Sequence, residues 1–192
     1  MPNTVLYLLR HGETEWALSG RHTGRTDISL TAKGRQQAAL LSDYISKLSF
    51  SKVLVSPLTR AQETAKLAGL SNFVVCADLA EFDYGDCEGL TTAEIRKNVP
   101  DWTVWTHPCS NGETLEQVRA RACKAIALAN EAGGNVALVS HGHMLRILTA
   151  TWLQLPPSEG RHFMLDTGTV SILSHERETP AIKLWNAPVM DR

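Results

Sequence analysis

The feature that most constrains this chain is a short apolar run, residues 5–9, that ends abruptly in Arg10, His11 and Gly12. Five apolar residues bounded by polar ones predict a buried strand rather than a helix. In open α/β sheets, ligands bind outside the carboxyl ends of the strands. The arginine offers a planar fork of donors that suits phosphate, and the imidazole is a nitrogen nucleophile near neutral pH. A glycine at this point lets the backbone approach a ligand closely.

A second apolar run, residues 136–140, ends in a similar way, in His141 and Gly142. Two parallel, adjacent strands would place His11 and His141 side by side at the carboxyl edge of one sheet. Arg60 lies in the first turn of a predicted helix that follows a third strand. Because a helix N-terminus attracts anions, these groups together predict a phosphate pocket.

Strands and helices alternate along the whole chain. This order predicts an α/β fold, a three-layer α/β/α sandwich with a mostly parallel central sheet, in one domain over residues 1–192. The predicted strands are 5–9, 52–56, 73–76, 136–140, 170–174 and 182–185, and the predicted helices are 31–48, 58–67, 91–99, 114–132 and 144–153. Two of these helices begin with a capping box, at Thr91 and Thr114. We interpret residues 16–30 as an irregular substrate-binding loop and residues 79–90 and 102–112 as further loops.

Composition narrows the classes of partner. The 192 residues have a net charge of −1, so nothing indicates a nucleic-acid partner or an anionic membrane surface. No apolar segment approaches the length of a membrane span, and Arg10 interrupts the N-terminal apolar run too early for a signal peptide. The histidines form no H-E-x-x-H pattern and the cysteines have no zinc-site spacing, so we expect no metal and no cofactor.

The four cysteines, Cys76, Cys87, Cys109 and Cys123, include no C-x-x-C pair. A chain of this length does not need a disulfide framework. We therefore interpret them as reduced thiols of a cytoplasmic protein, while a pairing of Cys87 with Cys109 stays open.

Four motifs follow one another along the chain: RHGETEW at 10–16, SPLTRAQETA at 56–65, EFDYGDCEG at 81–89 and SHGHMLR at 140–146. In this order and at these spacings the chain resembles the histidine phosphatase superfamily, the phosphoglycerate-mutase-like group. Among its branch 1 members, it is most similar to bacterial acid phosphatases and sedoheptulose-bisphosphatase-like enzymes. The resemblance covers nearly the whole chain and implies a phosphoglycerate-mutase-like fold.

The resemblance also implies roles for the catalytic residues. His11 matches the nucleophile that becomes a phosphohistidine, and Arg10, Arg60 and His141 match the phosphate pocket. Glu81 matches the proton donor, which would protonate the leaving alkoxide and then activate water. Asp83 is its main competitor for that role.

Thr23, Gly24 and Tyr84 match positions that line the substrate, and we add Gly142 beside His141 as a further substrate-binding candidate. Many mutase-type members carry Trp-Asn where this chain has Trp16 and Ala17, so we expect Ser19 to replace the missing amide. Four arginines in or near the predicted loops are candidates to reach a second phosphate: Arg21, Arg25, Arg146 and Arg161.

The span from Glu81 to His141 is short beside that of cofactor-dependent mutases, which enclose the substrate. A more open site admits water to the phosphohistidine. We therefore predict a metal-independent phosphatase acting on small phosphorylated metabolites, sugar phosphates or phosphoglycerate-like acids. The alternatives are a phosphoglycerate mutase and, as a non-enzyme, a phospho-ligand binding module. The oligomeric state stays open, a homodimer included.

Overall fold

The computed structural model describes residues 4–188. Its strands are β1 (Val5–Arg10), β2 (Lys52–Val55), β3 (Val74–Val75), β4 (Asn135–Ser140), β5 (Thr169–Glu176) and β6 (Thr179–Pro188). Its α-helices are α1 (Glu15–Leu18), α2 (Ala32–Ile45), α3 (Thr59–Leu67), α4 (Thr92–Ile95), α5 (Leu115–Ala132) and α6 (Gly142–Trp152). Three 3₁₀ helices complete the set: η1 (Ala77–Leu79), η2 (Gly85–Cys87) and η3 (Pro157–His162).

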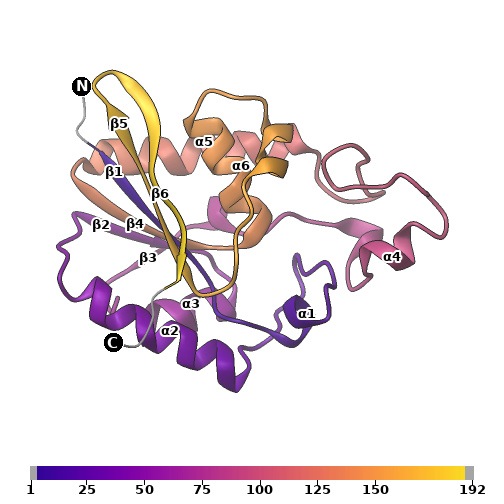
Figure 1. Cartoon of the computed structure of the whole chain (residues 1–192), viewed down its shortest axis with the longest axis horizontal. Helices are drawn as coiled ribbons and strands as arrows, with labels where there is room; N and C mark the ends of the chain where they lie inside the picture. Colours follow the sequence, from indigo (N-terminus) through magenta and orange to yellow (C-terminus); the bar gives the residue numbers. More distant parts are fainter. Residues whose placement is uncertain (1–3, 189–192) are drawn as a thin grey trace.

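The six strands form one sheet in the order β3-β2-β4-β1-β5-β6. Strands β1 to β4 are parallel, whereas β5 runs antiparallel to β1 and pairs with β6 as a hairpin at the sheet edge. Helices α2 and α3 cover one face and α5 and α6 cover the other, as Figure 1 shows. The predicted three-layer sandwich with a mostly parallel sheet is confirmed.

Apolar side chains alternate between two cores because successive strand residues face opposite sides of the sheet. In β1, Leu6 and Leu8 pack toward α5 and α6, while Leu9 packs toward α2 and α3. The pairing of β1 with β4 brings Arg10 opposite Ser140 in register. The residue that follows each of these strands is a histidine, His11 after β1 and His141 after β4. The prediction that these two histidines meet at one edge of the sheet is confirmed.

Several element boundaries differ from the predictions. The predicted loop 16–30 begins with a four-residue helix, α1, whose N-terminus is capped by the Thr14 hydroxyl. Helix α6 begins at Gly142, two residues earlier than predicted, because His141 is the extended N-cap residue. Both predicted capping boxes are present, although the helix after Thr91 is only four residues long. Within residues 4–188, no helix is both long and apolar enough to cross a membrane.

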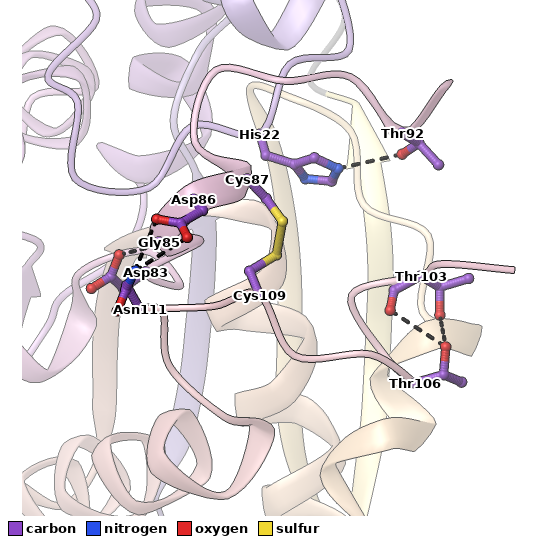
Figure 2. The surroundings of a disulfide bond; sticks show 10 residues. All are labelled: His22, Asp83, Gly85, Asp86, Cys87, Thr92, Thr103, Thr106, Cys109 and Asn111. Atoms are coloured by element: carbon purple, nitrogen blue, oxygen red, sulfur yellow. Dashed lines mark hydrogen bonds between the residues drawn. A yellow bond between two sulfur atoms is a disulfide. The ribbon is translucent and has the colours of Figure 1, made fainter. Parts of the chain in front are cut away.

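The interpretation of all four cysteines as reduced thiols is wrong for two of them. Cys87 and Cys109 form a disulfide that joins η2 to the loop before α5, as Figure 2 shows. The same two segments are joined by the Asp86 N–H, which donates to Ser110 O, and by the Asn111 amide, which donates to the Asp86 carboxylate. The other two cysteines, Cys76 and Cys123, are free.

Removing this disulfide should destabilise the fold. The bond closes a loop of 22 residues, for which the chain-entropy relation gives about 3 kcal/mol. We expect Cys109→Ser, and the wild type in a phosphine reductant, to lose about this much free energy of unfolding in urea titrations. Cys123→Ser, at an exposed free cysteine, is the control and should change it by less than about 0.5 kcal/mol. Equal stabilities of oxidised and reduced wild type would contradict the prediction.

Candidate active site

A cavity of about 190 Å³ opens at the carboxyl ends of β1 and β4. Its walls come from the two His-Gly turns, from α1 and the loop after it, from the segment around Glu81, and from the first turns of α6. Its lining residues are Arg10, His11, Thr14, Ala17, Gly20, Arg21, His22, Thr23, Glu81, Tyr84, Gly142, His143, Arg146 and Leu165.

The His11 ring has one nitrogen fixed and one available. Its Nδ1 lies 2.7 Å from the carbonyl oxygen of Gly12, which can only accept a hydrogen bond. Nδ1 therefore carries the proton, and Nε2 keeps its lone pair. Burial lowers the pKa of His11 well below its ordinary value of 6.5, and the charges of Arg60 and Arg10 lower it further. The ring is thus neutral near neutral pH, as a nitrogen nucleophile must be.

His141 lies beside His11, with 5.0 Å between the ring centroids, but both of its nitrogens are engaged. Its Nδ1 accepts from Arg60 Nε at 3.2 Å, so its Nε2 carries the proton and lies 2.7 Å from Ser56 Oγ. Burial and the charge of Arg60 hold the pKa of His141 well below the ordinary value. Of the two neighbouring rings, only His11 offers a free lone pair.

Arg60 is fully buried at the start of α3 and does not line the cavity. Its guanidinium donates to His141, whose ring lies beside that of His11, and to three main-chain carbonyls, those of Thr23, Gly24 and Thr26. Arg60 and His141 are thus both fully buried and absent from the cavity lining, and their part in binding the phosphate stays a prediction. In this arrangement Arg60 acts on His11 through its charge and holds the loop after α1 in place.

These buried neutral histidines make stability depend on pH. In the unfolded chain a histidine takes up a proton below about pH 6.5, whereas folded His11, His141 and His143 do not. Their contribution to stability is therefore complete above pH 6.5 and is lost as the pH falls.

We expect the free energy of unfolding to drop between pH 7 and pH 5, with a limiting slope of about 1.4 kcal/mol per pH unit for each of the three histidines whose pKa burial lowers well below 6.5, namely His11, His141 and His143. Urea titrations across this range measure the slope. His11→Gln should reduce it, while His162→Gln, at an exposed ring, should not. A flat profile in the wild type would rule this account out.

Arg10 lines the cavity at the end of β1 and has an unsatisfied donor. Its Nη1 donates to the carbonyl of Leu165, while its buried Nε has no hydrogen-bond partner within residues 4–188. A Cβ added at Gly142 would lie 3.4 Å from Arg10 Cζ, so the guanidinium lies against the first residue of α6. A bound oxyanion would satisfy the orphaned donor and would meet a helix N-terminus in the same place.

Glu81 approaches the cavity from the other side and is 8% exposed. Its Oε1 accepts from the N–H groups of Phe82 and Met144, both at 2.8 Å, and its Oε2 accepts from the N–H of His143 at 3.1 Å. Two of these donors belong to the first turn of α6. The competitor, Asp83, is absent from the lining and is paired with Arg25 at 2.7 Å. The geometry therefore favours Glu81 as the acid of this site.

Three of the predicted substrate-binding residues, Thr23, Tyr84 and Gly142, line the cavity. Gly24 does not: its N–H donates to the Glu88 carboxylate and its carbonyl accepts from Arg60.

Ser19 is exposed at the end of α1, where its hydroxyl donates to the carbonyl of Glu15. The structure does not bring it to the cavity, because a hydroxyl at a helix end is used by that helix. Its expected replacement of the missing amide has no geometric support.

The packing of Gly12 also differs from the expectation. A Cβ at Gly12 would collide with the carbonyl of Gly34, and a Cβ at Gly34 would collide with the carbonyl of Glu13. This glycine pair lets the turn after β1 pack directly against the first turn of α2. The close approach at Gly12 is therefore to another main chain, and it fixes the carbonyl that orients His11.

Sequence reasoning did not single out His143 as a site residue. The Tyr84 hydroxyl lies 2.6 Å from His143 Nδ1, and both side chains line the cavity with His22. Burial raises the pKa of Tyr84 well above 10.0 and lowers the pKa of His143 well below 6.5, so the tyrosine donates to a neutral ring. The position of His143 in the first turn of α6, directly after Gly142 and the end of β4, is the signal that could have found it.

Sequence reasoning also missed Glu88, whose carboxylate accepts from the N–H groups of Gly24 and Thr26. These bonds hold the loop whose carbonyls bind Arg60. Across residues 4–188, no cluster of three or more histidine, cysteine or acidic side chains is arranged to hold a metal ion.

Comparison with known proteins agrees with this geometry. The sequence profile described as "Histidine phosphatase superfamily (branch 1)" matches residues 6–188. The chain belongs to the histidine phosphatase superfamily. It is 48% identical over 178 residues to an acid phosphatase of Mycobacterium tuberculosis, an alignment that covers 91% of this chain and 88% of the relative.

A second superfamily relative, the sedoheptulose 1,7-bisphosphatase of Saccharomyces cerevisiae, is 33% identical, with 77% of this chain and 67% of the relative covered. Among solved structures, the product of the Mycobacterium tuberculosis open reading frame Rv3214 superimposes with a TM-score of 0.93 at 44% identity. That match covers 98% of this chain and 100% of the other. The predicted membership of the histidine phosphatase superfamily and the predicted fold are confirmed.

Proposed function

We propose that this protein is a metal-independent phosphatase that hydrolyses phosphomonoesters of small metabolites through a phosphohistidine at His11. The observation that carries the proposal is a neutral imidazole with a free Nε2 in one cavity with Arg10 and Glu81. The names of the relatives, an acid phosphatase and a bisphosphatase, support the same reaction class.

In the proposed reaction, the Nε2 lone pair of His11 attacks phosphorus and the ester P–O bond breaks. Arg10 and the N-terminus of α6 stabilise the negative charge on the transferring phosphoryl group. Glu81 gives its proton to the leaving alkoxide. The resulting carboxylate then takes a proton from water, which attacks the phosphohistidine and releases inorganic phosphate. His11 and Glu81 return to their starting states.

The test is release of inorganic phosphate from a panel of sugar phosphates and phosphoglycerates, with EDTA present throughout. We expect turnover that EDTA does not change. Incubation with 3-phosphoglycerate and a bisphosphate primer separates the mutase alternative, because a mutase accumulates the isomer without free phosphate. Tight binding of these esters without turnover would instead favour the binding-module alternative.

Arg146 supports a narrower proposal about the substrate. Arg21, Arg25 and Arg161 each form an ion pair with an acidic side chain. Arg146 lines the cavity and forms no ion pair within residues 4–188; its guanidinium donates to two main-chain carbonyls and lies 4.6 Å from the Trp105 ring centroid. We propose that it binds a second anionic group, a carboxylate or a phosphate, on the leaving group.

Replacing Arg146 with glutamine should therefore reduce selectivity rather than general activity. 3-Phosphoglycerate and glycerol 3-phosphate differ only in carboxylate against hydroxymethyl. We expect Arg146→Gln to lower kcat/KM about 10- to 100-fold for the first ester and less than about threefold for the second, since a charge-assisted contact is lost. The same comparison of kcat/KM on fructose 1,6-bisphosphate and fructose 1-phosphate tests whether Arg146 binds a second phosphate. Equal losses on all esters would disprove a role in selectivity.

The prediction of a cytoplasmic location remains a prediction, and the Cys87–Cys109 bond removes the argument from reduced cysteines.

A further inference from the structure

The segment that carries Glu81 is held by side chains rather than by the sheet. Its four consecutive main-chain carbonyls, from residues 78 to 81, all accept hydrogen bonds from side chains of other elements. Arg121 on α5 donates from Nη1 to the carbonyls of Asp78 at 2.9 Å and Ala80 at 2.8 Å, and from Nη2 to that of Glu81 at 3.3 Å. The fourth carbonyl, that of Leu79, accepts from Ser140 Oγ at 2.7 Å.

Arg121 is itself fixed by Glu113, which precedes α5. Arg121 Nε and Nη2 lie 2.8 Å from the two carboxylate oxygens of Glu113, a bidentate pair whose side chains are 17% and 19% exposed. Glu113 also accepts from the N–H of Asp83 at 3.0 Å, while its own N–H donates to the carbonyl of Asp83 at 2.9 Å. The Glu113–Arg121 pair therefore hydrogen-bonds to the main chain on both sides of Glu81, at residues 78–81 and at Asp83.

The position of the Glu81 carboxyl matters because a general acid must lie within hydrogen-bond reach of the oxygen that it protonates. A misplacement of about 1 Å can cost about 10²-fold in rate. The bonds from the α6 N–H groups fix the carboxyl itself, but they can form only if the 78–81 backbone is held at the right distance from α6.

We propose that Arg121, held by Glu113, is a positioning residue for Glu81 and sets its efficiency as the general acid. The guanidinium does not line the cavity. It reaches Glu81 through the backbone of residues 78–81 and through Met144, whose Sδ lies 3.8 Å from Arg121 Nη1 and whose N–H donates to the Glu81 carboxylate. The inference rests on the proposed phosphatase function.

A matched pair of esters separates positioning from a merely structural role. Benzyl phosphate and p-nitrophenyl phosphate are similar in size, but the first leaves as a strongly basic alkoxide and the second as a stable phenolate. Only the alkoxide depends on a proton from the acid. A loss of fold or of phosphate binding would lower turnover of both esters alike.

The experiment compares kcat and KM of the wild type, Arg121→Gln, Arg121→Lys and Glu81→Gln on both esters. Arg119→Gln, at a surface ion pair on the same helix, is the control. We expect Arg121→Gln to lower kcat about 10²-fold on benzyl phosphate and less than about threefold on p-nitrophenyl phosphate, with KM little changed. Arg121→Lys should recover part of the loss, and Arg119→Gln should behave as wild type.

Equal losses on the two esters, or no loss on benzyl phosphate, would overturn the inference and leave the proposed function standing. Failure of the proposed function is seen separately, as a wild type that hydrolyses neither ester, and this also overturns the inference. If Arg121→Gln does not fold, Glu113→Gln weakens the Glu113–Arg121 pair while keeping the arginine. The same comparison of the two esters then tests the inference.

Discussion

Replacing His11 with alanine is expected to lower kcat by at least about 10⁴-fold on every phosphomonoester that the wild type hydrolyses. The loss should be this large because no neighbouring group can take over the attack. His141, the adjacent ring, has one nitrogen accepting from Arg60 and the other donating to Ser56. Steady-state phosphate release measures the effect.

The control for His11→Ala is His162→Ala, which removes an exposed imidazole and should leave kcat within about twofold of wild type. Circular dichroism and a thermal melt of both variants confirm that the fold is kept. Residual turnover in His11→Ala within about tenfold of wild type would show that another group, or water directly, attacks phosphorus.

Replacing Glu81 with glutamine is expected to lower kcat about 10²- to 10⁴-fold on alkyl phosphates, the range usual for loss of a general acid. The amide keeps the size of the side chain, and its one oxygen can still accept from the N–H of Met144, but its NH2 group cannot accept from the N–H of His143 and it has no carboxyl proton to give. On p-nitrophenyl phosphate the loss should be much smaller.

A matched control for Glu81→Gln is Asp83→Asn, because Asp83 lies two residues away and is paired with Arg25 outside the cavity. It should change kcat by less than about threefold. A larger effect on alkyl phosphates from Asp83→Asn than from Glu81→Gln would transfer the role of the acid to Asp83.

The sequence was sufficient to predict the architecture and the meeting of His11 with His141. Short apolar runs that end in polar residues mark the carboxyl ends of buried strands, and parallel strands share an edge. The capping boxes at Thr91 and Thr114 fixed two helix starts, because these are local hydrogen-bond patterns.

What could not be predicted are contacts between side chains far apart in the chain. The bond from Arg60 to His141 joins residues 81 positions apart, and both side chains are fully buried instead of exposed on the cavity wall. The Cys87–Cys109 disulfide and the hold of Arg121 on residues 78–81 are of the same kind. Ser19 was wrongly placed for the opposite reason, because of a short-range contact. Its hydroxyl donates to the carbonyl of Glu15 within α1 and is therefore not directed to the site.

Direct detection of the phosphorylated residue tests the central claim. Trypsin cleaves after Arg10 and Arg21, so the peptide from 11 to 21 contains His11 as its single histidine, whereas His141 and His143 fall together in another peptide. A brief reaction with a phosphomonoester, an alkaline quench and mass spectrometry should find an acid-labile phosphate on the 11–21 peptide. Phosphate on the peptide with His141 and His143, or none on any peptide during a pre-steady-state burst of alcohol release, would contradict a phosphohistidine at His11.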